Sequence, residues 1–221
     1  MEKTLRRKIL LGLWAAIAWT VAVGILFAGN AVKANDTQKR IVILGDSITA
    51  GYGLDPGESY PAVLQKKIDQ AKLPFVVANA GVSGDTTAGG LRRVAWAMTK
   101  RADILVIALG GNDGLRGISP AETKKNLLGI VSKARTRNPK IQVFIAGMQM
   151  PDNMGHEFTE RFKTLFPAVA KESKSTLIPF LIEGVGGDER LNQADGIHPT
   201  AEGQKIIAEN VWKILQPKLI K

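Results

Sequence analysis

The segment IVILGDSITAGYG, residues 41–53, joins an uninterrupted apolar run to a glycine-rich polar turn. Four further apolar runs follow, with starts about 30–40 residues apart, the length of one strand and its crossover helix. Because the runs are continuous rather than alternating, we expect strands covered on both faces. The pattern predicts parallel strands at Ile41–Leu44, Phe75–Ala78, Ile104–Leu109, Ile141–Ala146 and Thr176–Ile182.

Helix signals occupy the segments between these runs. The stretch SPAE, residues 119–122, is a capping box with proline at the first helical position. Apolar residues from Phe158 to Val169 follow a 3.6-residue period, and Pro167 is expected to kink that helix. An amphipathic helix containing Ile207 and Val211 closes the chain. These signals predict one three-layer α/β/α sandwich around a five-stranded parallel sheet.

The amino-acid composition excludes several classes of protein and several kinds of functional site. The 221 residues are 45% hydrophobic and 23% charged, which fits a folded domain with a sizeable core and excludes disordered and collagen-like chains. The absence of cysteine excludes a disulfide scaffold, thiolate metal sites and a cysteine nucleophile. With only His156 and His198, a multi-histidine metal site is disfavoured, and a histidine-dependent mechanism has two candidates.

The net charge of +10 is divided between the two ends of the chain. Residues 1–34 hold five basic groups and one acid, which supplies +4 and leaves +6 for the rest. There the basic residues are scattered among acids, as in KKID at residues 66–69. We therefore expect a solvated surface and no nucleic-acid partner, with weak attraction to anionic lipid or polymer as the alternative. We also expect the protein to be a monomer.

The amino-terminal segment predicts export. Basic residues Lys3 to Lys8 precede an uncharged run from residue 9 to residue 31, and VKA at residues 32–34 places small residues for cleavage after Ala34. The run is longer than most signal peptides and could span a bilayer. We expect residues 1–34 to be a signal peptide or a retained membrane anchor, and residues 35–221 to form a domain outside the cytoplasmic membrane.

Glycine-bearing polar turns follow the first three predicted strands. They are GDS at residues 45–47, NAGVSGD at 79–85 and GGNDG at 110–114, while DGIHP at 195–199 lies just before the last helix. In open parallel sheets, ligands bind beyond the carboxyl ends of the strands. We therefore expect all four turns to meet at one edge of the sheet.

Together these turns supply the groups needed for acyl transfer. Ser47 is the candidate nucleophile, and it needs a base such as His198, whose ordinary pKa of about 6.5 lies near working pH. Asp195 can orient that imidazole through its other ring nitrogen. The backbone N–H groups of Ser47 and Gly84 and the side-chain amide of Asn112 are candidate donors to the oxyanion.

Other interpretations of the same residues remain open. Each turn taken alone is ordinary turn chemistry. His156, preceded by Asp152 and placed after the fourth predicted strand, is an alternative base. Asp46, Asp85 and Asp113 could form a carboxylate cluster for a metal ion, although each lies beside glycine, where turns favour aspartate.

The four turns resemble the ordered sequence blocks of the GDSL, or SGNH, hydrolase superfamily. The blocks are GDSITAGYG at residues 45–53, SGDT at 83–86, GGND at 110–113 and DGIHP at 195–199, and the resemblance spans residues 41–216. It implies that Ser47, Gly84, Asn112 and His198 are the name-giving residues and that Asp195 completes the triad. It also implies a flavodoxin-like three-layer fold without metal or cofactor.

Within this superfamily the chain is similar to the bacterial periplasmic thioesterase, lysophospholipase and arylesterase branch. The stretch GMQMP at residues 147–151 and the compact length support this placement, whereas Ile48 and Thr49 stand where leucine and serine are commoner. The resemblance implies a serine esterase that hydrolyses aryl and acyl esters, with acyl thioesters and lysophospholipids as further substrates, through an acyl-enzyme intermediate.

The substrate pocket is predicted from apolar residues that follow the third and fourth strands. We expect Leu115, Ile118 and Met150, with Met148 and Met154 nearby, to form an adaptable acyl pocket, because methionine fits irregular shapes. The alternative is that they belong to the ordinary core. Two rival functions remain, an O-acetyl esterase for carbohydrate or cell-wall substrates and a non-catalytic flavodoxin-like binding module.

Overall fold

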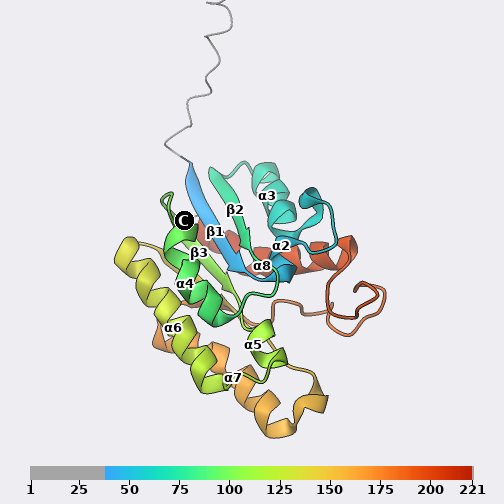
Figure 1. Ribbon diagram of the computed structural model, residues 1–221. Helices are drawn as coiled ribbons and strands as arrows, with labels where there is room; N and C mark the ends of the chain where they lie inside the picture. Colours follow the sequence, from blue (N-terminus) through green and yellow to red (C-terminus); the bar gives the residue numbers. More distant parts are fainter. Residues whose placement is uncertain (1–37, 221) are drawn as a thin grey trace, which may run out of the picture. The chain divides into compact units, whose positions relative to one another are not determined.

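The computed structural model describes residues 38–220, and the signal peptide or anchor expected at residues 1–34 lies outside them. The described residues form a five-stranded parallel sheet flanked by helices (Figure 1). The strands are β1 (Lys39–Gly45), β2 (Phe75–Gly81), β3 (Ile104–Ala108), β4 (Gln142–Ala146) and β5 (Thr176–Ile178). The α-helices are α2 (Ser47–Ala50), α3 (Tyr60–Gln70), α4 (Thr87–Ala97), α5 (Gly111–Leu115), α6 (Pro120–Arg137), α7 (His156–Glu172) and α8 (Ala201–Leu219), with short 3₁₀ turns at Pro56–Glu58 and Asp152–Met154.

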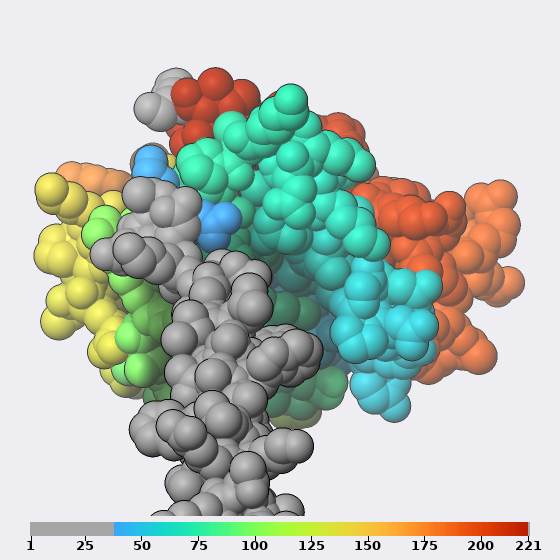
Figure 2. All heavy atoms as spheres, turned by 90° about the horizontal axis from the view of Figure 1, so that it is seen from above, coloured from blue at the N-terminus to red at the C-terminus, as the bar shows by residue number. Residues whose placement is uncertain are grey.

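Helices cover both faces of the sheet, which gives the three layers that the sequence predicts. On one face α3 packs against α8, and on the other α4 packs against α6, which packs against α7. In Figure 2 the cyan and teal atoms of residues 50–75 and the yellow atoms near residues 125–150 accordingly lie on opposite sides. Among residues 38–220, no helix is both long enough and apolar enough to cross a membrane.

The strand order β2-β1-β3-β4-β5 places β1 between β2 and β3. This is the flavodoxin-like order, in which the switch point between β1 and β3 is where ligands bind. Gly45 at the end of β1 pairs with Gly81 of β2 and with Ala108 of β3. The carboxyl ends of three strands are therefore level, and the turns that follow them start from one edge of the sheet.

The strand predictions are confirmed in place, with differences that have physical reasons. β1 and β3 are buried, but β2 is only partly buried because it is an edge strand, a position that its apolar sequence does not reveal. β5 ends at Ile178, short of the predicted Ile182, because Pro179 has no N–H to donate. One half of the predicted capping box is confirmed, since Ser119 Oγ accepts from the Glu122 N–H at the start of α6, where Pro120 is the first helical residue. Pro167 lies inside α7, which continues to Glu172.

Candidate active site

Ser47 is the first residue of α2, directly beyond the end of β1. Asp46 caps this short helix, because its Oδ1 accepts from the Ile48 N–H at 3.0 Å. Gly51, with a φ of 79°, ends the helix in a left-handed conformation that favours glycine, and its N–H donates to the Ser47 carbonyl. Capped at both ends within a few residues, the turn holds Ser47 half-buried at the edge of the sheet.

Asp195 and His198 form a compact unit before α8. Asp195 Oδ1 accepts from the backbone N–H groups of Ile197 and His198 at 2.9 and 3.0 Å, and its Oδ2 lies 2.6 Å from His198 Nδ1. The His198 backbone N–H, then its ring N–H, together with the Ile197 N–H, lower the pKa of Asp195 to about 2. Asp195 is therefore a carboxylate at neutral pH, and His198 Nδ1 is the donor to it.

The other ring nitrogen of His198 faces the serine. His198 Nε2 lies 2.9 Å from Ser47 Oγ, so the structure joins Asp195, His198 and Ser47 in one chain of hydrogen bonds. With Nδ1 protonated, Nε2 accepts the serine proton, which is the arrangement that activates a hydroxyl for nucleophilic attack. The exposed His156 begins α7, and the histidine that contacts Ser47 is His198.

Two glutamines join the turn that carries His198 to the helix that carries Ser47. Gln193 Nε2 donates to the carbonyls of Tyr52 and Pro199 at 2.7 and 3.1 Å. Buried Gln204 of α8 accepts from the Tyr60 N–H at 2.8 Å and donates to the Ile48 carbonyl at 3.0 Å. Sequence analysis missed both residues, although a polar Gln204 on the apolar stripe of the last helix was a usable signal.

Tyr52 is a third neighbour that sequence analysis missed. Its ring centroid lies 4.5 Å from that of His198, with the ring planes tilted by 37°. The tyrosine is 53% exposed, so it shields one side of the imidazole from water while remaining at the surface. Its place in the GDSITAGYG stretch was a signal, but the stretch alone did not reveal its partner.

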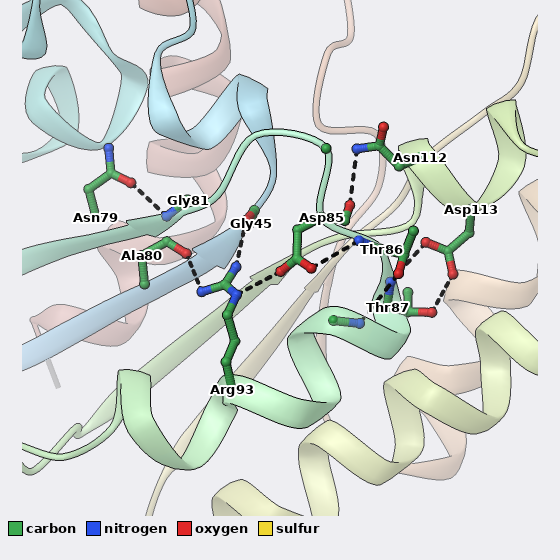
Figure 3. A network of polar contacts seen from close by, with 12 residues as sticks. Gly45, Asn79, Ala80, Gly81, Asp85, Thr86, Thr87, Arg93, Asn112 and Asp113 are labelled. Carbon is green, nitrogen blue, oxygen red and sulfur yellow. Dashed lines mark hydrogen bonds and ion pairs between the residues drawn. The ribbon is translucent and has the colours of Figure 1, made fainter.

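Gly84 and Asn112 lie on the turns that follow β2 and β3. Gly84 has a φ of 75°, where any other residue would be strained. Asn112 Nδ2 donates to the carbonyl of Asp85 at 3.0 Å, which fixes the plane of the amide (Figure 3). Because the strand ends are level, the two candidate donors lie on turns adjoining that of Ser47.

A mainly apolar cavity of about 380 Å³ is lined by Asp46 and Ile48, the residues on either side of Ser47 in the chain. Of the predicted pocket residues, Leu115, Met148 and Met150 line it, whereas Ile118 and Met154 do not. An added Cβ at Gly114 would lie 2.0 Å from the Met150 sulfur, so glycine at that position makes room for the methionine. Sequence analysis missed two residues after β5, Phe180 and Ile182, that also line the cavity.

The three aspartates considered for a metal ion have separate partners. Asp46 binds the Ile48 N–H, Asp85 pairs with Arg93, and Asp113 accepts from the Thr87 N–H at 2.8 Å. Burial raises the pKa of Asp113, and its hydrogen bonds from Thr87 oppose that rise. Within residues 38–220, no three histidine, aspartate or glutamate side chains gather as a metal ion would require.

Asp46 is a buried carboxyl beside the serine. The residue lines the cavity and is 4% exposed. Burial raises the pKa of Asp46 to about 6, although the hydrogen bond from Ile48 opposes the change. The charged form of Asp46 is therefore disfavoured in the folded protein relative to the unfolded chain.

Replacing Asp46 with asparagine should stabilise the protein mainly above pH 6. The unfolded carboxyl ionises near pH 3.8 and the folded one near 6, so stability falls as pH rises between these values and the loss is constant above them. The loss amounts to as much as about 3 kcal/mol. Urea unfolding of Asp46→Asn should show a free-energy gain over the unsubstituted protein that grows by about 2 kcal/mol from pH 4 to pH 7. A gain that does not depend on pH would contradict this expectation.

Comparisons with known proteins agree with this geometry. The model of the GDSL-like lipase/acylhydrolase family matches residues 43–206, which contain all the candidate site residues named above. The chain is 44% identical over 180 residues to esterase TesA of Pseudomonas aeruginosa, covering 81% of this chain and 89% of the relative. It is 37% identical over 178 residues to thioesterase 1/protease 1/lysophospholipase L1 of Escherichia coli K12, with coverages of 80% and 83%.

A solved structure is similar in fold over most of the chain. The psychrotrophic esterase EstA from Pseudoalteromonas sp., in a structure inhibited by monoethylphosphonate, superposes with a TM-score of 0.78 and 29% identity. The match covers 83% of this chain and 100% of that one. The residues matched by the family model include all four turns. The chain therefore belongs to the GDSL-like lipase/acylhydrolase family.

Proposed function

We propose that this family member is a serine esterase in which Ser47, His198 and Asp195 form the catalytic triad. Ser47 Oγ attacks the acyl carbon while His198 Nε2 takes the hydroxyl proton. The tetrahedral intermediate then collapses, the bond to the leaving alcohol or thiol breaks, and His198 returns the proton to that group. Water attacks the acyl-enzyme by the same route and releases the carboxylic acid.

The observation that carries this proposal is the continuous chain from Asp195 to His198 to Ser47, with contacts of 2.6 and 2.9 Å. The carboxylate stabilises the imidazolium that forms during attack and fixes the tautomer before it. The stack of Tyr52 on His198 restricts rotation of the ring. The base is thus oriented before substrate binds.

The negative charge on the tetrahedral oxygen requires donors that are already aimed at it. We assign the backbone N–H groups of Ser47 and Gly84 and the side-chain amide of Asn112 to this oxyanion hole. The Asp85 carbonyl accepts one N–H of the Asn112 amide, which leaves the second free for substrate. Loss of one such donor typically raises the barrier by about 2.7–4 kcal/mol.

The cavity beside Ser47 supports an acyl-binding role. Its lining includes Leu115, Met150 and Phe180, all apolar, together with Asp46, the residue before Ser47. Small esters, acyl thioesters and lysophospholipids each present an acyl chain to such a cavity. The names of the relatives, esterase and thioesterase/lysophospholipase, support the same substrate classes.

Truncation of Leu115 should change the acyl-length preference. Leu115 lines the cavity and is 48% exposed, so alanine opens the mouth of the cavity without disturbing the core. Each methylene that loses its apolar contact weakens binding by about 0.8 kcal/mol, so kcat/KM for octanoyl esters should fall about three- to tenfold relative to acetyl esters. The ratio should stay constant in Ile220→Ala, a substitution at an exposed residue after α8. If the ratio of kcat/KM for octanoyl and acetyl esters is unchanged in Leu115→Ala, Leu115 does not contact the acyl chain.

Hydrolysis of p-nitrophenyl esters from acetyl to palmitoyl, with matched thioesters and a lysophospholipid, tests the function. We expect turnover that a serine-directed phosphonate abolishes. An optimum at acetyl, with faster deacetylation of an acetylated glycan, would favour the carbohydrate O-acetyl esterase. No turnover and no reaction with the phosphonate would favour the binding module.

We also propose that the hydrolase domain comprises residues 35–221 and acts as a monomer in the periplasm, with residues 1–34 as its signal peptide or anchor. The basic start and long uncharged run of that segment support export. Mass spectrometry of the protein from the membrane and soluble fractions would distinguish the two fates. A mass that begins after Ala34 corresponds to cleavage, and the full mass in the membrane fraction corresponds to an anchor.

A further inference from the structure

Arg93 of α4 lies beneath the candidate active site and binds three partners (Figure 3). Its Nε donates to Asp85 Oδ2 at 2.6 Å, and its two terminal nitrogens donate to the carbonyls of Ala80 and Gly45, both at 2.8 Å. The side chains of Arg93 and Asp85 are only 17% and 10% exposed. The planar guanidinium makes these bonds at once, which a lysine ammonium on its flexible stem cannot reproduce.

The three partners of Arg93 lie on segments that carry or adjoin candidate site residues. Gly45 ends β1, two residues before Ser47, and Ala80 lies near the end of β2. Asp85 follows Gly84, and its carbonyl accepts the Asn112 amide at 3.0 Å. One side chain therefore connects the segments that carry the nucleophile and both turn-borne oxyanion donors, without touching the reacting atoms.

The Asp85 carboxylate packs closely against the start of α4. An added Cβ at Gly89 would lie 1.6 Å from Asp85 Oδ1, so α4 has glycine where the carboxylate approaches the helix. The same oxygen accepts from the Thr86 N–H at 3.1 Å. Asp85 is thus held on one side by Arg93 and on the other by the start of α4, which orients its backbone carbonyl toward Asn112.

We propose that Arg93 is a positioning residue that sets the oxyanion hole, an inference that rests on the proposed serine esterase function. Its ion pair with Asp85 fixes the turn that presents the Gly84 N–H. Through the Asp85 carbonyl, it also orients the amide of Asn112. Arg93 reaches the segment of Ser47 only through the Gly45 carbonyl, whereas the turn of His198 and the helix of Ser47 are also supported by Gln193 and Gln204.

Replacing Arg93 with methionine should lower kcat about 10- to 100-fold, because displacement of preorganised groups by about 1 Å has effects of this size. KM should change less than about twofold, since the donors act mainly on the transition state. The pH profile of kcat should keep its shape, because the triad is intact. Arg93→Lys should recover part of the loss, and Arg92→Met, at the exposed neighbouring residue of α4, should match the unsubstituted protein.

A double-mutant cycle with Asn112→Ala separates positioning from general destabilisation. Asn112→Ala alone should lower kcat about 10²- to 10³-fold. If Arg93 acts through the oxyanion hole, Arg93→Met should cost less than about fivefold in the Asn112→Ala background, because coupled residues are not additive. An unchanged 10- to 100-fold cost in both backgrounds would overturn the proposal, as would full activity of Arg93→Met.

Two further measurements cover the case in which Arg93→Met does not fold and the case in which the proposed esterase function itself is wrong. If Arg93→Met does not fold, Gly89→Ala takes its place in the cycle, because it displaces the Asp85 carboxylate while Arg93 remains. With Gly89→Ala in place of Arg93→Met, additive effects of the two substitutions on kcat would again overturn the proposal, and non-additive effects would support it. Retained hydrolysis by Ser47→Ala would remove the serine esterase function itself, whereas activity that needs Ser47 and Asn112 but not Arg93 would contradict this inference alone.

Discussion

Ser47→Ala should lower kcat for ester hydrolysis on the order of 10⁶-fold while leaving the thermal midpoint almost unchanged. The hydroxyl supplies the attacking oxygen, and its side-chain contact is the 2.9 Å hydrogen bond to His198. Alanine keeps the backbone of α2, whose caps come from Asp46 and Gly51. The measurement is the burst and steady-state release of p-nitrophenol, with the melting temperature recorded on the same samples.

The control for this substitution is another serine. Ser132→Ala, at an exposed position of α6, should hydrolyse the ester at the unsubstituted rate. A phosphonate should add its mass once to the unsubstituted protein and to Ser132→Ala, and not to Ser47→Ala. Hydrolysis by Ser47→Ala within tenfold of the unsubstituted rate would exclude Ser47 as the nucleophile.

His198→Ala should lower kcat by a similar amount, on the order of 10⁶-fold, because His198 is the histidine within residues 38–220 that contacts the serine. Without the base, the hydroxyl keeps its proton at neutral pH and remains a poor nucleophile. Since Ser47 and His198 act as one unit, the double variant should be no slower than either single variant. Rates with p-nitrophenyl butyrate over pH 5–9 would measure both effects.

His156→Ala is the matched histidine control. His156 is exposed at the start of α7, and its loss should leave kcat within about twofold of the unsubstituted value, as expected for a surface residue. Loss of turnover in His156→Ala, together with retained activity in His198→Ala, would reverse the assignment of the base.

The strands and the turns that follow them could be predicted because their signals are local. Three of the five continuous apolar runs are followed directly by glycine, and the GDS and DGIHP turns carry complementary side chains. The structure brings Ser47, Asp195 and His198 into contact, and their catalytic roles stay a prediction. The partial exposure of β2 could not be predicted, because strand order depends on which helices cross which face of the sheet.

The supporting residues escaped sequence analysis because their partners are distant in the chain. Arg93 contacts the Gly45 carbonyl across 48 residues, and Gln204 contacts the Ile48 carbonyl across 156. Both donate to backbone carbonyls. Because every residue has a backbone carbonyl, the sequence does not indicate which one will accept the hydrogen bond. The pocket was only partly predicted for a similar reason, since Phe180 and Ile182 follow a strand that ended earlier than its apolar run.

The separation of Ser47 from its base has a temporal consequence. The two residues are 151 positions apart, and His198 lies directly before the final helix, whose Gln204 holds the two parts together. During synthesis the nucleophile leaves the ribosome early, and its base follows only when the chain is nearly complete. Until those late residues have been made and have folded, Ser47 lacks its contact with His198, so the proposed hydrolysis requires the carboxyl-terminal part of the chain.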